Sequence, residues 1–517
     1  MRKHPAVFVL ALLLCAASNP AAADGTIPLD GDVPDDAAQF FWIPFQVPPG
    51  TTEIEVLHDD LSADNILDWG LYDPAGYRGW GGGNTENAIV NEKAASRSYL
   101  PGAITPGMWR VLVGKAKIAV KPAHYHVVVT LRNAPTLAAQ TERAPYRPAM
   151  PLKSGLRWYA GDFHVHSRES GDAKPTLDAI ATFARGRGLD FVALSDHNTT
   201  AHLQFINDAQ SRRPDLLLIP SVEFTTYAGH ANALGATQFV DHKIGFEGAT
   251  IAAADQAFAM QKAVFSINHP VLDLGPVCIG CSWKHEIPAH IGAIEIATGG
   301  WMQSGRLFDE RAIAYWDELN KWEHHLTPLG GSDDHSAGTA MGKTDSPIGD
   351  PTTMVLADSL SAEAIIEAVR RGRTVVKLQG PGDPMVDLTS GNARIGDTVN
   401  ELRPTLTVTV TGGKGTVVRL VRNGQGLEFV PVDADPFTYK REVTISDNDR
   451  YRAEVWDGSI RTVTGHLYIP AFVVDPVQDK GKGCNAAPGR RMEGPAAIAV
   501  AGLFGLLGIW VRRRRRE

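Results

Sequence analysis

The chain has 517 residues, which allows about three or four domains. Its 44% apolar and 21% charged residues are close to the globular average, which excludes a disordered protein and a coiled coil. The formal net charge is −8, and both ends are basic, so the middle of the chain is more acidic still. Because nucleic acid is held by clustered Lys and Arg, we exclude a general nucleic-acid surface and disfavour long polyanionic substrates.

The first 23 residues have the layout of a secretory signal peptide. Arg2 and Lys3 precede an apolar run over residues 6–17, and three alanines at 21–23 offer a small-residue cleavage site. We therefore predict that residues 1–23 direct export and that the body of the protein is extracytoplasmic.

Residues 24–133 are predicted to form a β-sandwich domain. Short runs that alternate apolar and polar residues, such as 52–57 and 125–131, are separated by Gly, Pro and Asn. The glycine-rich stretch 79–84 lacks the Lys-Ser/Thr pair of a phosphate-binding loop, so it is predicted to be a turn. Residues 134–153, rich in Ala, Pro and charged side chains, are predicted to be a linker.

Between residues 154 and 380 the pattern changes to alternating β and α segments. Strands are predicted at 159–165, 191–194, 216–222, 231–234, 264–267, 291–296 and 326–329. Helices are predicted at 176–187, 251–262 and 307–324, the last with Leu307, Ile313 and Trp316 in the core. Seven strands with intervening helices predict a parallel sheet or a barrel. Alternating runs return over 381–474, where a second β-sandwich is expected.

Residues that bind metals in other proteins stand at the carboxyl end of nearly every predicted strand of this central region. They are His164, His166, Asp196, His197, Glu223, His230, His269, Asp333 and His335, with Asp172 in the loop after the first strand. In βα folds these strand ends converge on one mouth. Imidazole together with carboxylate suits Zn, Mn or Fe rather than Ca or Mg. So many ligands predict two or three metals, with Glu223 as the bridge.

Five short motifs follow one another within residues 155–380. They are DFHVH at 162–166, LSDHNT at 194–199, VEF at 222–224, NHP at 268–270 and GSDDH at 331–335. Their order and spacing resemble those of the polymerase-and-histidinol-phosphatase (PHP) superfamily. The leading β domain and the CIGCSW motif at 278–283 are most similar to its carbaryl-hydrolase-like branch.

The resemblance implies a distorted (β/α)7 barrel with a di- or trinuclear metal centre, flanked here by the two β-sandwiches. The implied ligands are His164, His166, Asp172, His197, Glu223, His230, His269, Asp333 and His335. Two positions depart from the pattern: Asp172 stands where relatives often have histidine, and His230 follows Glu223 more closely than in some of them.

Asp196, Glu223 and His230 are the predicted catalytic residues. Asp196 is expected to orient His197 or a bound water rather than to bind metal directly, as outer carboxylates commonly do. Glu295 ends a strand and is either another such orienting group or an ordinary strand residue. The remaining histidines of this region lie outside the motifs and are predicted to be structural: His202, His242, His285, His290, His324 and His325.

Two bridged cations would lower the pKa of bound water and supply hydroxide as the nucleophile. The resemblance favours a metal-dependent phosphoesterase that hydrolyses small phosphate mono- or diesters, including nucleotides. A carbamate or carboxylic ester hydrolase is the second interpretation, and exonuclease-like activity the third. From a different class, the protein could be a non-catalytic surface binding protein whose barrel has lost its function.

The cysteines and the C-terminus bear on location. Cys278 and Cys281 form a lone CxxC, which in an exported protein predicts a small disulfide loop. Residues 475–494 are a spacer with Cys484, residues 495–511 are an apolar helix just long enough to span a bilayer, and an arginine cluster lies within 512–517. This tail resembles the C-terminal sorting tails of Myxococcus-type bacteria, or it is a plain single-pass anchor. Either predicts attachment to the membrane or cell surface.

Overall fold

The computed structural model describes residues 24–471, apart from 62–63, 322–323, 340–345, 402 and 446. All of the described residues belong to one compact unit. The predicted signal peptide, Cys484, the apolar segment 495–511 and the arginine cluster lie outside the described residues. Among the residues that are described, no helix is long and apolar enough to cross a membrane.

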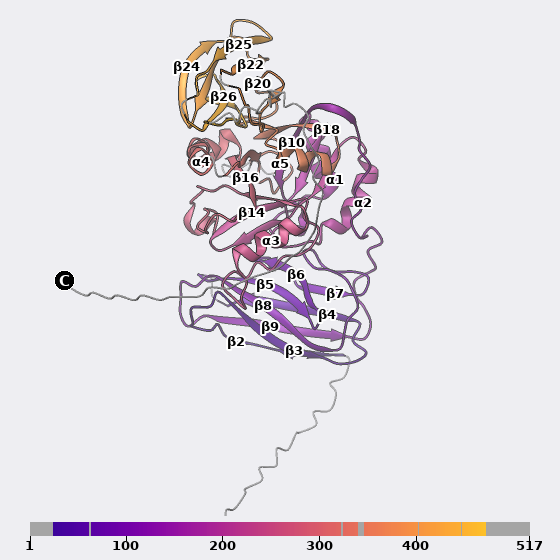
Figure 1. Cartoon of the computed structure of the whole chain (residues 1–517). Coiled ribbons are helices and arrows are strands. Elements are labelled where there is room, and N and C mark those ends of the chain that lie inside the picture. The colour runs from indigo at the N-terminus through magenta and orange to yellow at the C-terminus, as the bar shows by residue number, and fades with distance from the viewer. Residues whose placement is uncertain are drawn as a thin grey trace, which may run out of the picture. The chain divides into compact units, whose positions relative to one another are not determined.

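The N-terminal region contains two antiparallel sheets that share one core (Figure 1). One sheet contains β1 (Gly25–Pro28), β9 (His124–Arg132), β4 (Glu53–Asp60) and β7 (Ala88–Asn91), with β2 (Gly31–Asp32) paired to β9. The other contains β3 (Phe40–Val47), β8 (Gly107–Lys117), β5 (Ile66–Asp73) and β6 (Gly76–Gly82). The core side chains Val56, Trp69 and Trp109 come from both sheets, as in a β-sandwich.

The segment 134–153 contains neither helix nor strand, yet its side chains are fixed to the regions on both sides. Thr136 Oγ1 donates to Glu53 Oε1 of the sandwich at 2.6 Å. The Arg143 guanidinium donates to the backbone oxygen of Tyr99 at 3.2 Å and to Gln204 Oε1 at 3.0 Å. The linker therefore ties the N-terminal sheets to the central region.

The central strands lie in two sheets, and a closed (β/α)7 barrel is not confirmed. The first contains β12 (Leu217–Pro220), β11 (Phe191–Leu194), β10 (Ser154–Val165), β18 (Thr352–Ser359) and β19 (Thr374–Lys377). The second contains β13 (Glu223–Thr226), β14 (Gly229–Leu234), β15 (Val264–Ile267), β16 (Ile291–Thr298) and β17 (Thr327–Gly331). Isolated bridges join the two sheets, Val165 with Asp334 and His197 with Glu223.

The departure from a regular β/α ladder has a local cause. Only two residues, Tyr227 and Ala228, connect β13 to β14, and so short a connection makes the pair antiparallel. β14 and β15 are also antiparallel, as are β10 and β18. Among the strands that the structure describes, the parallel pairs are those within β10–β11–β12 and β15–β16–β17.

The described part of the central region contains five α-helices: α1 (Leu177–Gly186), α2 (Leu203–Arg212), α3 (Ile251–Met260), α4 (Arg306–Leu319) and α5 (Ala362–Arg370). Shorter turns of helix are η1 (Arg168–Ser170), η2 (Gly275–Val277) and η3 (Trp301–Gly305). Thr176, Thr250 and Ser361 cap α1, α3 and α5 through their hydroxyl oxygens. The helix predicted to reach residue 324 ends at Leu319, and Leu307, predicted to be in the core, is 71% exposed.

The C-terminal strands lie in two sheets that share one core, and one of these sheets continues the sheet of β10. β27 (Ile460–Thr464) pairs antiparallel with β19, and β26 (Asp449–Trp456), β23 (Val417–Arg422), β24 (Gln425–Pro431) and β28 (Leu467–Ile469) extend it. A second sheet contains β21 (Ala393–Arg394), β20 (Met385–Ser390), β22 (Thr405–Thr411) and β25 (Phe437–Glu442). The shared core includes Val375 of β19, so the boundary expected near residue 380 lies inside a packed unit.

Candidate metal centre

The structure brings the nine predicted ligands together at the ends of the central strands. His164 and His166 come from the end of β10, His197 follows β11, Glu223 begins β13 and His230 lies in β14. The others lie in loops: Asp172 after η1, His269 after β15, and Asp333 and His335 after β17. Since these segments are far apart in the sequence, only the fold places their side chains in one cluster.

Glu223 lies at the middle of the cluster. Its Oε1 is 3.3 Å from His164 Nε2, 3.4 Å from His230 Nδ1 and 3.4 Å from His269 Nε2. Its Oε2 is 2.6 Å from His197 Nδ1 and 3.6 Å from His166 Nε2. The carboxylate is fully buried, and Asn268 Nδ2 donates to Oε1 at 2.8 Å. Its two oxygens thus face two different groups of imidazoles, which is the arrangement of a bridging ligand.

Three overlapping sets of donor atoms, which share His164 and His166, are each close enough to hold a cation. Within each set the donor atoms lie within 4.8 Å of one another: His166, Asp172, His197 and His335; His164, His166 and Asp333; His164, Glu223 and His269. His230 groups instead with His269 and Cys281, but the Cys281 sulfur is in a disulfide with Cys278. Histidine with carboxylate suits divalent transition metals.

Unsatisfied buried atoms indicate that the cluster is built to hold cations. His164 Nε2, Glu223 Oε2 and His230 Nε2 are buried and have no hydrogen-bond partner among the described residues. Buried polar atoms in native proteins almost always have a partner. Cations between these atoms would satisfy all three, so the residues present fit a metal centre.

The outer nitrogen of several ligand rings is held by a neighbouring group. His269 Nδ1 donates to the backbone oxygen of Cys281 at 2.9 Å, and His335 Nδ1 donates to that of Asp333 at 2.8 Å. His166 Nδ1 lies 3.0 Å from Ser170 Oγ. In each ring this leaves Nε2 facing the cluster, which fixes the tautomer and the direction of the ligand.

Charge within the cluster changes the pKa values of its members. Burial alone would lower the pKa of His164, but Asp333, Glu295 and Glu223 raise it well above the usual value. Burial alone would raise the pKa of Glu223, but His197, His164 and His230 lower it well below the usual range. Burial also lowers the pKa of His335, whereas Asp172 and Asp333 raise it, to about 9 overall. Without metal, therefore, protons occupy part of the ligand set.

Asp196, predicted to orient His197 or a water, has different neighbours in the structure. Its carboxylate accepts from the Ser167 backbone nitrogen at 2.6 Å and from Ser167 Oγ at 2.5 Å, and lies 3.3 Å from His202 Nδ1. Its fully buried side chain fixes the turn that follows His166, and it belongs to none of the groups of metal-binding donors. The sequence pattern predicts that Asp196 lies at the end of a strand, near the ligands. It does not predict the direction in which the side chain points.

Glu295, for which the sequence left two interpretations open, contacts the ligands directly. Oε1 lies 2.8 Å from His164 Nδ1, and Oε2 accepts from the backbone nitrogen of His269 at 2.8 Å. The histidines predicted to be structural, by contrast, are absent from every group of donors among the described residues. His202, for example, is buried against the backbone oxygen of Ser221.

The centre opens into a cavity of about 690 Å³. Its wall includes six of the ligands: Asp172, His197, His230, His269, Asp333 and His335. The disulfide loop contributes Cys278, Ile279 and Cys281. A cavity of this volume lies in the range that binds small molecules.

No protein-family model and no curated protein matches the chain. Solved structures match at low identity. A two-domain protein of Bacteroides vulgatus that contains a predicted PHP-like metal-dependent phosphoesterase is 20% identical, with 64% of this chain and 99% of that chain covered and a TM-score of 0.36. An amidohydrolase of Chromobacterium violaceum is 15% identical, with 36% and 93% covered and a TM-score of 0.25.

Proposed function

We propose that the protein is a metal-dependent phosphoesterase that hydrolyses small phosphate mono- or diesters with two or three divalent transition metals. The observation that carries this proposal is the position of Glu223, whose two oxygens lie 2.6–3.6 Å from nitrogens of five histidines. Such a set of donors can hold cations side by side, as the two-metal sites of phosphatases and nucleases do.

When bound, the cations would activate water as the nucleophile and neutralise charge on the phosphoryl oxygens. The protein's own residues hold the geometry. Glu223 is kept in place by Asn268, and the rings of His164 and His269 are kept in place by Glu295 and by the Cys281 backbone. Preorganised donors of this kind need little rearrangement during the reaction.

Phosphate esters are proposed as the substrates because the five motifs resemble those of the PHP superfamily. The cavity of about 690 Å³ supports a small substrate rather than a long polymer. We also propose that the protein works outside the cytoplasm, attached to the membrane or cell surface by its C-terminal tail. The disulfide between Cys278 and Cys281 supports an oxidising location.

The proposal is tested with the purified full-length chain loaded with Mn²⁺. Rates are compared on 4-nitrophenyl phosphate, bis(4-nitrophenyl) phosphate and 4-nitrophenyl methylcarbamate, each with and without EDTA. We expect turnover of a phosphate substrate that EDTA abolishes. Turnover of the carbamate alone would make the protein a hydrolase of carboxyl-type esters, and no turnover of any of them with metal bound would contradict the proposal.

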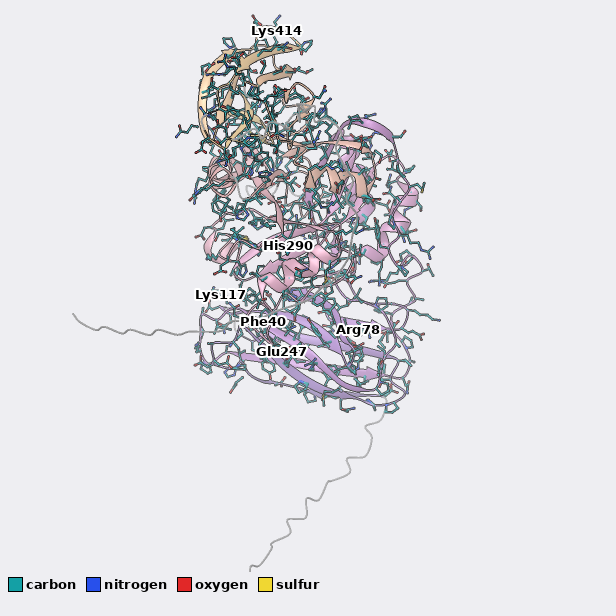
Figure 2. All side chains as sticks on the ribbon, in the orientation of Figure 1. Phe40, Arg78, Lys117, Glu247, His290 and Lys414 are labelled. Carbon is teal, nitrogen blue, oxygen red and sulfur yellow. A yellow bond between two sulfur atoms is a disulfide. The ribbon has the colours of Figure 1, made fainter. Side chains whose placement is uncertain are left out.

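A matched pair of variants ties the activity to the cluster. His164→Ala combined with His335→Ala is expected to lose the EDTA-sensitive turnover. His290, labelled in Figure 2, lies outside the cluster with its ring near Asp255, and His290→Ala is expected to keep the turnover. Full activity in the double variant would show that another site does the chemistry.

A further inference from the structure

The N-terminal sandwich forms part of the wall of the metal cavity. Ile66 and Asp68 of β5, Trp80 of β6, Asn84 and Ala116 all line the cavity that contains Asp172, His197 and His335. The glycine-rich stretch predicted only as a turn supplies Gly81, Gly82 and Gly83 to the same wall. The sandwich therefore faces any substrate that reaches the metals.

Contacts between the sandwich and the ligand loops are close. A Cβ atom on Gly171, beside Asp172, would lie 2.7 Å from the backbone oxygen of Gly81. Tyr77 Oη donates to the backbone oxygen of Asn198 at 2.7 Å, directly after His197. Only glycine fits at position 171, where φ is 93°. The absence of a side chain there lets the loop approach the backbone of Gly81.

Tyr227 extends the interface on the side of the central region. Phe40 of β3, labelled in Figure 2, stacks on the Tyr227 ring with centroids 5.5 Å apart. A Cβ atom on Gly114 of β8 would lie 2.1 Å from Tyr227 Oη, so the phenol group fits against a strand that has no side chain there. The ring thus packs between the two regions.

One hydrogen-bonded pair on this wall joins the two regions. Tyr227, from the short connection between β13 and β14, donates its hydroxyl to Asp68 Oδ2 at 2.7 Å. The other carboxylate oxygen, Oδ1, accepts no hydrogen bond from the part of the chain that the structure describes. Burial raises the pKa of Asp68 to about 6. Asp68 lies on the cavity wall, and this oxygen can accept a hydrogen bond. It therefore favours a ligand with a hydrogen-bond donor at this position.

We propose that Asp68, positioned by Tyr227, is a specificity-determining residue that binds a hydroxyl or ammonium group of the ester. The inference rests on the proposed phosphoesterase function and names its substrate class: small phosphate esters with a polar hydrogen-bond donor, such as an amino alcohol. The N-terminal sandwich is then part of the substrate site.

The test uses three diesters with the same leaving group: 4-nitrophenyl ethyl phosphate, its 2-hydroxyethyl analogue and its 2-aminoethyl analogue. For the Mn²⁺-loaded full chain we expect kcat/KM to be highest for the 2-aminoethyl ester. Asp68→Asn should reduce the ratio between the 2-aminoethyl and ethyl esters by about 10- to 100-fold, the effect of losing one hydrogen bond to a charged group. Tyr227→Phe should reduce the same ratio by a smaller factor.

Asp59→Asn is the matched control, because Asp59 is an exposed carboxylate on β4 of the same sandwich. It should leave the ratio unchanged. Metal content and melting temperature of each variant are measured alongside, so that loss of metal or of folding is not mistaken for loss of recognition. A ratio near one in the unchanged protein, or a ratio that survives Asp68→Asn, would overturn the inference while leaving hydrolysis established.

A binding measurement separates this inference from the proposed function. O-Phosphoethanolamine and ethyl phosphate are titrated calorimetrically into the Mn²⁺-loaded protein and into Asp68→Asn. We expect tighter binding of the amine by the unchanged protein and loss of that preference in the variant. This result without turnover of any phosphate mono- or diester would refute the proposed hydrolysis alone, whereas equal binding or no binding of both would refute the role of Asp68.

Discussion

The Glu295 carboxylate lies 2.8 Å from Nδ1 of His164, and because a carboxylate only accepts, Nδ1 must carry the proton and Nε2 must face the cluster. The second oxygen of Glu295 accepts from the backbone nitrogen of His269 at 2.8 Å and from Thr298 Oγ1 at 2.9 Å. One buried side chain within β16 therefore positions His164 at the end of β10 and His269 in the loop after β15.

Glu295→Gln is expected to weaken metal binding by about 10- to 100-fold, the usual cost of losing an outer partner of a histidine ligand. The amide can still accept one hydrogen bond but brings a donor to the wrong place. Affinity is measured by competition with a chromophoric chelator. Glu310→Gln, an exposed position on α4, is the control, and equal affinity in both variants would mean that Glu295 does not position His164.

The disulfide loop is expected to support the ligand His269. Cys281 accepts the Nδ1 hydrogen bond of His269 through its backbone oxygen, and the disulfide to Cys278 closes the loop. Replacing both cysteines with serine should lower the occupancy of the cation that His269 holds and so reduce metal per chain at limiting Mn²⁺. Metal content is measured after dialysis. Unchanged content in the double variant would show that the loop keeps its shape without the disulfide.

Metal uptake is expected to release protons and to strengthen as the pH rises. In the metal-free centre the pKa of His335 is about 9, because Asp172 and Asp333 outweigh the effect of burial. Below that pH the ring carries a proton that a cation must displace. Calorimetric titration with Mn²⁺ at pH 6.5 and pH 8, each in two buffers of different ionisation enthalpy, measures affinity and proton release. Equal affinity at both pH values with no proton release would contradict this account.

Asp317 of α4 is expected to stabilise the contact with the C-terminal strands. Its Oδ2 lies 2.8 Å from Arg452 Nη2, and its Oδ1 lies 3.5 Å from His466 Nε2. Both Asp317 and Arg452 are buried. Asp317→Asn should lower the free energy of unfolding at pH 7 by about 3 kcal/mol, because it leaves a buried charge poorly compensated. Urea unfolding of the metal-free protein measures this, with exposed Glu318→Gln as control.

The effect of Asp317 should depend on pH in a defined direction. Burial alone would raise its pKa, but His466 and Arg452 lower it below the usual value. A depressed pKa in the folded state gives stability that is present above the unfolded pKa, roughly 3.9, and is lost as the pH falls toward the folded pKa. The difference between the unchanged protein and Asp317→Asn should therefore be smaller at pH 3 than at pH 7. A difference in the free energy of unfolding that grows as the pH falls would contradict a lowered pKa of Asp317 in the folded state.

The sequence located the cluster because its ligands stand at strand ends, where periodic patterns are easy to detect. His164, His197 and His269 each follow an apolar run, and the β/α alternation predicted that such ends converge. The closed barrel was not confirmed, since the antiparallel hairpin of β13 and β14 depends on a two-residue connection that apolar patterns do not distinguish from a crossover.

Other features depend on contacts that no local pattern records. Asp68 and Tyr227 are 159 positions apart, so their hydrogen bond exists only once the sandwich packs on the central region. The pairing of β19 with β27 likewise links segments that the sequence pattern places in separate domains. The motif of Asp196 predicts a place beside the ligands, but its side chain is held by a hydrogen bond from Ser167.

Glu223 would bridge the cations, and this is tested by the metal content per chain of the purified protein and of Glu223→Gln. After loading with Mn²⁺ and dialysis, elemental analysis by mass spectrometry gives the ratio of metal to protein. We predict at least about two metals per chain in the unchanged protein and fewer than one in Glu223→Gln, because this carboxylate would help to hold both cations. Two or more metals retained by Glu223→Gln, or less than one in the unchanged protein, would contradict the account.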